Sequence, residues 1–450
     1  MISFAFIAMP LVLTIFFALT SFFIGKKTPI FFVAYLILFL YTIFTQLGYL
    51  FYPDLLDVLS FGQYYGEKSF IVYWWYIFLS FLSIFLIFAV VWRKNYQSLV
   101  KVEIDDKKRF GGVWYIMFVI FYEIILLAFL IANYRELGYS TQGVMKNSTI
   151  WFYMFALNGI LMLTLYIKIT VLNRGSAKLV YLFLFAVSVL IFMATAIRSG
   201  QRIEIGSTLL SFLVFFWYRF SKQILAQKKI ILYVMAIILL AGIVFQGIRN
   251  SRGGNEGPGP FFAVLRNPDT YSQLFRPEIV IFQDWFVPSL TLVTSIEKDI
   301  KIPITALWSD LSLFIPFISH ISLGEIISRI IDPDGITGYG YYVLTEGYNL
   351  VGFFGFMISA VIFVLGFRLL ELFFASTKDN LFNAFMCAII AYSIIDIIRG
   401  QNIFYLKTLY LYFLPSLLFY YLMSGKRISL MVLAQNGRLQ QKKNHSAKTN

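Results

Sequence analysis

The chain has 450 residues and a formal net charge of +14, yet only 13% of its residues are charged and 59% are hydrophobic. Soluble domains carry about 25% charged residues, so this composition excludes an ordinary soluble protein. The single cysteine, Cys387, excludes an intramolecular disulfide.

Apolar stretches of about 20 residues follow one another along the chain, and each is long enough for a helix that crosses about 30 Å of hydrocarbon. The eleven predicted spans cover about 1–24, 30–50, 69–92, 113–132, 150–171, 179–197, a seventh ending near 218, then 230–245, 351–373, 381–398 and 404–422. The first has no basic n-region and no small-residue cleavage site, which favours an uncleaved span over a signal peptide. We therefore predict an all-α polytopic integral membrane protein.

Lysine and arginine are distributed unevenly between alternate loops, and such asymmetry marks the cytoplasmic side of a membrane. The richer set of loops holds Lys26 and Lys27, the segments 93–109 and 219–229, and the C-terminal tail. With eleven spans, this set falls on one side throughout. We therefore predict that the N-terminus lies outside and the C-terminus inside.

A long connection between the eighth and ninth predicted spans begins with a polar, basic and Gly/Pro-rich stretch, 249–260. Connections longer than about 12–15 residues are usually functional or disordered, and the many Phe, Trp, Ile and Leu residues here favour a folded cap. We predict four regions: a transmembrane bundle of about eight spans at 1–248, a large outer (periplasmic) cap at 249–338, about three spans at 339–424, and a basic cytoplasmic tail at 425–450.

Arginines stand at three places on the predicted outer boundary: Arg198 with Arg202, Arg249 with Arg252, and Arg399. The planar fork of arginine pairs well with phosphate oxygens. Converging beneath the cap, these side chains would bind a phosphate or diphosphate at the level of the lipid headgroups. The alternative is that each arginine only anchors the protein at the headgroups.

Two carboxylates, Glu123 and Asp396, fall inside predicted spans, where an ionisable group is a functional hypothesis by default. Asp396 stands three residues before Arg399, a spacing that favours a local ion pair. Glu123 is either a proton-relay residue, as in a transporter, or a buried residue that accepts a hydrogen bond.

Several functional classes lack their motifs in this sequence. It holds no Walker A loop, no Cys/His cluster and no Gly-rich dinucleotide signature, so we predict no metal and no cofactor. The loop asymmetry and the basic tail account for the net positive charge, and we predict no nucleic-acid partner.

Short motifs follow in order over the C-terminal part of the chain. They are the turn Ala196-Ile197-Arg198-Ser199-Gly200-Gln201-Arg202, the basic entry to the outer loop, Leu307-Trp308-Ser309-Asp310 with Ile315-Pro316, the segment 346–355, and Ile398-Arg399-Gly400. In this order and on this topology, the chain resembles the Wzy-type polymerases of oligosaccharide repeat units, which include the O-antigen polymerases. The N-terminal half matches that family only in hydropathy.

The resemblance implies a metal-independent glycosyltransferase with a GT-C-like fold in the bacterial inner membrane, its active site facing the periplasm. Such an enzyme moves a growing glycan from undecaprenyl diphosphate onto a new lipid-linked repeat unit, and undecaprenyl diphosphate leaves. The implied partners are undecaprenyl-diphosphate-linked oligosaccharides, membrane lipids, a chain-length regulator and a flippase.

For this activity we predict that Arg399 is the main diphosphate ligand and that Arg198 and Arg202 assist it. Arg249 and Arg252 would hold the second lipid diphosphate or the cap.

The acceptor sugar needs its own residues, and Glu346 or Asp284 would orient its hydroxyl while Tyr348 stacks on a sugar ring. Glu346 and Tyr348 each have a structural alternative. Glu346 would cap the N-terminus of the ninth span, and Tyr348 would anchor the interface.

Two other functions fit the same composition. An O-antigen ligase would share the cap and the arginines, although the segment 346–355 favours the polymerase. A lipid-linked oligosaccharide flippase or transporter would depend on a charge within the membrane such as Glu123, but the sequence shows no internal repeat typical of transporters.

Overall fold

A computed structural model describes most of the helical part of the chain: residues 4–51, 67–93, 100–105, 112–133, 148–171, 175–199, 203–226, 282–303, 326, 330, 342–374, 379–400, 404–425 and 427–432. The main helices are α1 (Phe4–Lys27), α2 (Pro29–Phe51), α4 (Glu67–Val91), α5 (Val113–Ala132), α6 (Ser148–Val171), α7 (Ser176–Ser199), α8 (Ile203–Ala226), α13 (Phe282–Glu297), α16 (Val343–Val351), α17 (Gly355–Phe374), α18 (Asn380–Ile398), α19 (Phe404–Lys407) and α20 (Leu414–Ser424). The two strands are β1 (Val100–Asp105) and β2 (Arg427–Val432).

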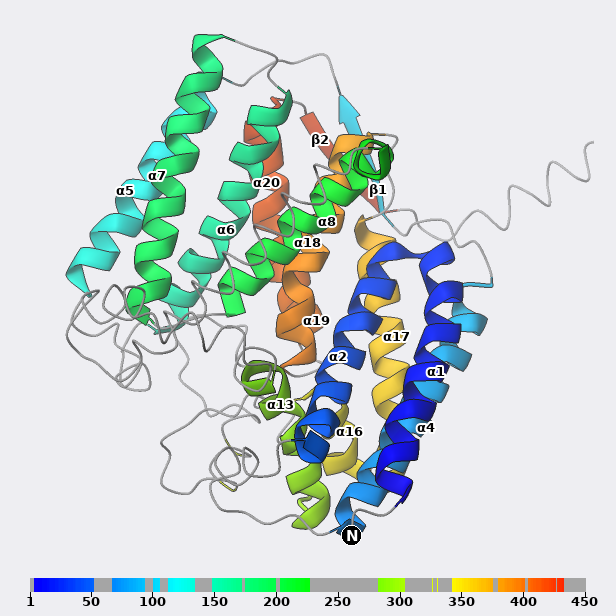
Figure 1. Cartoon of the computed structure of the whole chain (residues 1–450). Coiled ribbons are helices and arrows are strands. Elements are labelled where there is room, and N and C mark those ends of the chain that lie inside the picture. The colour runs from blue at the N-terminus through cyan, green and yellow to red at the C-terminus, as the bar shows by residue number, and fades with distance from the viewer. Residues whose placement is uncertain are drawn as a thin grey trace, which may run out of the picture.

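The helices form two groups, and α18 joins them (Figure 1). In the first group, α1, α2 and α4 pack with α13, α16 and α17, whereas in the second, α5, α6, α7 and α8 pack with α20. α18 contacts α8 in one group and α2 in the other. Its apolar stretch is 72% buried, the highest value among the candidate membrane spans of the described residues. Most of α18 is therefore enclosed by other helices rather than by lipid.

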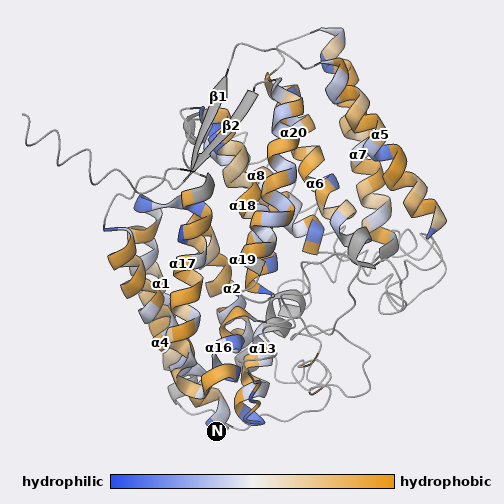
Figure 2. Cartoon of the chain, turned by 180° about the vertical axis from the view of Figure 1, so that it is seen from behind, coloured by the Kyte–Doolittle hydropathy of each residue, from blue (hydrophilic) through white to orange (hydrophobic). Residues whose placement is uncertain are grey.

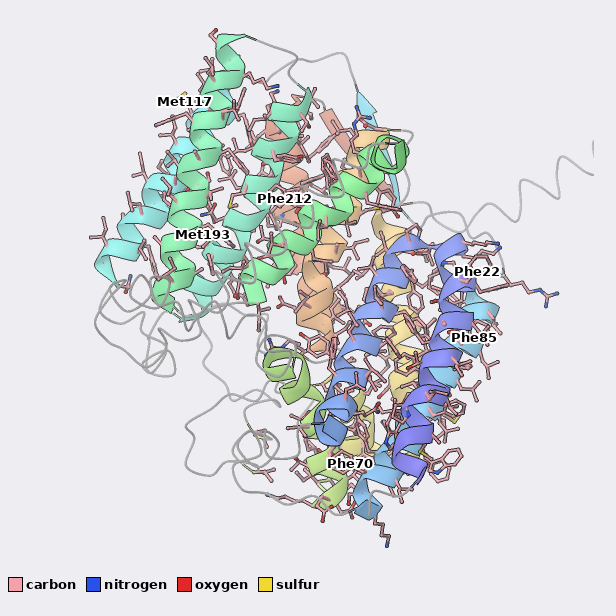
Figure 3. All side chains as sticks on the ribbon, viewed as in Figure 1. Phe22, Phe70, Phe85, Met117, Met193 and Phe212 are labelled. Atoms are coloured by element: carbon pink, nitrogen blue, oxygen red, sulfur yellow. The ribbon has the colours of Figure 1, made fainter. Side chains whose placement is uncertain are left out.

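The described residues contain eight helical stretches that are long and apolar enough to cross a membrane, so this is a multi-pass membrane protein. Their outward faces are apolar (Figure 2), and on α1 the exposed side chains Leu11, Ile15, Leu19 and Phe22 form one stripe. Figure 3 places Phe22 and Met117, both exposed, on opposite edges of the molecule. Both edges thus present the kind of surface that lipid tails cover.

Ten of the eleven predicted spans coincide with described helices, and the eighth, at about 230–245, lies outside the described residues. The predicted all-α class needs one amendment, because β1 and β2 form a small antiparallel sheet from Val100↔Val432 to Asp105↔Arg427. In Figure 1 this sheet lies at the end of the helix array opposite the first turn of α1. We call the end with the sheet the inner end and the end where α1 begins the outer end, following the predicted orientation.

The longer apolar stretch that contains the predicted ninth span, Val343–Leu372, is not one continuous helix. The chain breaks at Gly352, whose φ of +73° is a backbone conformation that favours glycine, and a 3₁₀ turn, Gly352–Phe354, joins α16 to α17. A Cβ on Gly355 would overlap the Gly347 carbonyl oxygen, although in a straight helix eight residues rise about 12 Å. α16 therefore folds back along α17, and the glycines let the two backbones touch.

The part of the predicted cap that the structure describes belongs to the first helix group. The side chains of α13 from Ser289 to Ser295 are all buried. Ser289 shares a hydrogen bond with Thr45 of α2, and Thr291 shares one of 3.1 Å with Thr345 of α16. These hydroxyl pairs satisfy polar groups that would otherwise be costly in a membrane interior, and they fix α13 between α2 and α16.

Candidate functional site

The candidate site lies where α8 begins and α18 ends, at the ends of these two helices that point away from the sheet and toward the outer end (Figure 1). The Thr208 side chain of α8 lies beside Tyr392 of α18, because Gly159 of α6 leaves room for both. A Cβ at Gly159 would come within 2.6 Å of the Thr208 Oγ1 and 3.1 Å of the Tyr392 Cε2. One turn earlier on α8, Glu204 lies within electrostatic range of Tyr392. Three helices thus converge on one polar cluster in an otherwise apolar protein.

Arg399 is the C-cap residue of α18, and its backbone N–H donates to the Ile395 carbonyl at 2.9 Å. Its position suits a cation, since the C-terminal end of a helix carries a partial negative charge. The side chain is half-buried and makes no ion pair or hydrogen bond with any residue that the structure describes, and its Nε is shielded from solvent. Among the described residues, the guanidinium therefore has no anionic partner.

The ion pair expected between Asp396 and Arg399 does not form, so that prediction is wrong. The Tyr412 hydroxyl instead donates to the Asp396 Oδ2 at 2.8 Å. Tyr412 belongs to a π-helical segment, Thr408–Phe413, between α19 and α20. Pro415 follows it, and because a proline removes a backbone donor and crowds the carbonyl four residues earlier, the wider π turn has a local cause. π turns occur often at functional sites.

The other predicted arginines are only partly placed. α7 ends at Ser199 and α8 begins at Ile203, so the backbone of Arg198 lies at the end of α7 that adjoins the start of α8. The Arg198 side chain lies outside the described residues, as do Arg202, Arg249 and Arg252 altogether. Their convergence on Arg399 remains a prediction.

The predicted acceptor residues belong to the first helix group. Glu346 and Tyr348 lie on α16, and Asp284 lies in the first turn of α13, its side chain outside the described residues. Glu346 is 5% exposed and stands in the first turn of α16. The Lys301 Nζ lies 4.5 Å from the centre of the Tyr348 ring. Glu346 also lies within electrostatic range of Tyr405 on α19.

A second cluster of a cation and a carboxylate, which sequence reasoning missed, lies at the inner end of α17. Glu371 is buried and accepts hydrogen bonds from Thr28, from the Trp92 Nε1 at 3.1 Å and from the Arg368 Nη1 at 3.2 Å. The Arg368 guanidinium also lies 5.1 Å from the centre of the Trp92 ring. A signal was present, since Arg368 and Glu371 stand three residues apart inside the predicted ninth span.

The residues that sequence reasoning missed at the outer site are Glu204, Thr208, Tyr392 and Tyr412. Each comes from a different part of the chain or carries a side chain common in apolar helices, so no local pattern marks them. Within the described ranges, no three His, Cys, Asp or Glu side chains gather as metal ligands. No family model, no curated protein and no solved structure matches the chain.

Proposed function

We propose that the protein is a membrane glycosyltransferase that polymerises undecaprenyl-diphosphate-linked oligosaccharide repeat units at the outer face of the bacterial inner membrane. One observation carries the proposal: the Arg399 guanidinium, at the outer end of the most enclosed described span, has no anionic partner among the described residues. Transfer of a glycan from a lipid diphosphate needs such a cation, because negative charge grows on the departing diphosphate. The motifs that resemble the Wzy-type polymerases point to the same reaction.

The surroundings of Arg399 suit this chemistry. A half-buried guanidinium sits close to the headgroup region, and fixed donors act more strongly there than in water. Asp396 stands one turn before Arg399 on α18, and both Asp396 and Glu204 of α8 lie within electrostatic range of the Tyr392 hydroxyl, so an acceptor sugar hydroxyl would meet hydrogen-bonding partners nearby. The Arg198 backbone at the end of α7 allows a second arginine to reach the diphosphate.

The rival function, a flippase, would depend on Glu123 in the middle of α5. Glu123 is 5% exposed and its Oε1 accepts a hydrogen bond from the Ser188 hydroxyl of α7 at 2.5 Å. This partner supports the interpretation of Glu123 as a buried hydrogen-bonding residue, and it makes Glu123→Gln a mild change that the polymerase should tolerate.

The test replaces the native gene with variants and resolves the surface glycan on a gel. We expect Arg399→Ala to leave single repeat units on the core with a normal protein level, because export and ligation continue while polymerisation fails. Arg93→Ala is the control and should keep the full ladder. Arg93 is exposed and lies just beyond the last residue of α4, at the inner end of the protein. A full ladder after deletion of the gene would refute the polymerase, and loss of all surface glycan would indicate a flippase or a ligase.

A further inference from the structure

Asp396 is held in a defined position at the outer site. The Tyr412 hydroxyl bonds to its Oδ2 at 2.8 Å, and the Tyr412 ring packs edge to face on Tyr392, with ring centres 5.3 Å apart. Arg399 follows on the same helix, and side chains three residues apart on a helix have Cβ atoms about 5–6 Å apart. The carboxylate and the unpaired guanidinium are therefore neighbours that do not neutralise each other.

Two buried hydroxyls, those of Tyr392 and Thr208, lie close together at the same site. Tyr392 is 1% exposed and Thr208 is 4% exposed. The two hydroxyls share at most one weak hydrogen bond with each other, and neither bonds to any other described residue, so donor and acceptor capacity is left over. Leaving a buried hydroxyl unpaired costs roughly 1–3 kcal/mol. Such groups indicate a hydrogen-bonding ligand.

The ligand chemistry follows from the set of groups around the Tyr392 hydroxyl. The carboxylates of Glu204 and Asp396 both lie within electrostatic range of that hydroxyl, so a ligand there meets acceptors as well as donors. A sugar hydroxyl both donates and accepts a hydrogen bond. The cluster fits one hydroxyl of a sugar, placed within reach of Arg399.

We infer that Asp396 is the general base of the reaction and that Tyr412 is its positioning residue. The inference rests on the proposed function and names the base of the same site. The acceptor hydroxyl gives its proton to Asp396 while its oxygen forms a bond to the anomeric carbon of the donor glycan. The bond from that carbon to the diphosphate oxygen breaks, and undecaprenyl diphosphate leaves with the electron pair, facing Arg399. The proton then passes from Asp396 to water on the outer side.

Neither Glu346 nor Asp284 is then the base. Both lie on helices of the first group. Asp396 differs from them in standing one turn from Arg399, on the same helix, with its carboxylate fixed by Tyr412. Asp396 is also preferred to Glu204 as the base, because the hydrogen bond from Tyr412 fixes the Asp396 carboxylate.

The experiment measures polymer formation in membranes that contain the full-length protein and detergent-extracted lipid-linked repeat units. General-base catalysis contributes about 100-fold or more, so Asp396→Asn should lower the rate by at least that factor at a normal level of folded protein. Asp396→Glu should keep a measurable rate, and added formate should restore part of the activity of Asp396→Ala. Glu123→Gln, a matched change of another buried carboxylate, should stay within twofold of the native rate.

A rate for Asp396→Asn above a tenth of the native rate would overturn the assignment while leaving the polymerase intact, provided that Arg399→Ala still abolishes the ladder. Tyr412→Phe tests the positioning role. We expect kcat to fall about tenfold with KM unchanged, since loss of one hydrogen bond to a charged group corresponds to roughly that factor. A lower amount of folded protein with a native kcat would show that Tyr412 is only structural.

Discussion

The inner end of α17 and the outer end of α18 carry the same pair of residue types at the same spacing, and they use it in opposite ways. Arg368 and Glu371 form an ion pair of 3.2 Å, closed further by Trp92 and Thr28. Asp396 and Arg399 stand three residues apart as well, but Tyr412 takes the carboxylate and the guanidinium lacks a partner among the described residues. One pair stabilises the fold, whereas the other leaves a cation for a ligand.

The difference shows what helical spacing can and cannot determine. Residues three apart are always neighbours on a helix, yet a third group decides whether they pair. At the inner end, Trp92 donates to the carboxylate and its ring lies against the arginine, so both partners are held together. At the outer end, Tyr412 donates to the acid, and Arg399 sits at the end of the helix.

The largest effect should come from Glu371→Ala, which breaks the inner pair. Removing one partner of a buried ion pair costs about 3–5 kcal/mol, because the remaining charge is left unpaired. We expect a large drop in the heat-unfolding midpoint of the detergent-solubilised protein. The midpoint is measured by size-exclusion chromatography after heating. A midpoint within a degree of the native one would mean that the inner cluster is not structural.

Trp92→Phe sharpens the comparison by keeping the ion pair and removing one of its supports. The hydrogen bond from Nε1 to Glu371 disappears, and the contact of the ring with Arg368 weakens. We expect the free energy of unfolding to fall by about 2 kcal/mol. Chemical denaturation monitored by far-UV circular dichroism measures this change. Trp75→Phe, which changes an exposed tryptophan on the same helix, serves as the control and should alter stability little.

Tyr412→Phe makes the corresponding change at the outer end. Because Asp396 is only half-buried, water can replace the lost donor, and we expect a loss of about 1 kcal/mol. Heat unfolding in detergent would measure it beside Trp92→Phe. A loss larger than that of Trp92→Phe would reverse the proposed contrast between the two ends.

Arg399→Ala should have the smallest effect on stability, within about 0.5 kcal/mol, since no described contact is lost. The same substitution should abolish polymer formation, so stability and activity separate at this residue. The measurement is the unfolding midpoint of the preparation used for the activity assay. Strong destabilisation would mean that Arg399 holds the fold together.

Much of the fold was predictable, because about 20 apolar residues in a row have few alternatives to a membrane-spanning helix. The break at Gly352 was not, since the apolar run passes through it without interruption and only the close approach of Gly347 and Gly355 reveals the reversal. The site was half predictable. Arg399 stood out as a cation at a predicted boundary, but its unpaired state depends on Tyr412, and no local pattern joins a tyrosine to an acid 16 residues earlier.

The pairing of β1 with β2 has a consequence for the order in which the protein is assembled. β1 precedes α5, whereas its partner follows α20, so almost the whole second helix group is synthesised between the two strands. β1 therefore has no partner strand until the last helix has been synthesised. An unpaired strand edge is prone to pair with other chains. The ribbon can therefore close only after α20 has been synthesised, and a chain cut before Arg427 would leave β1 without its partner strand.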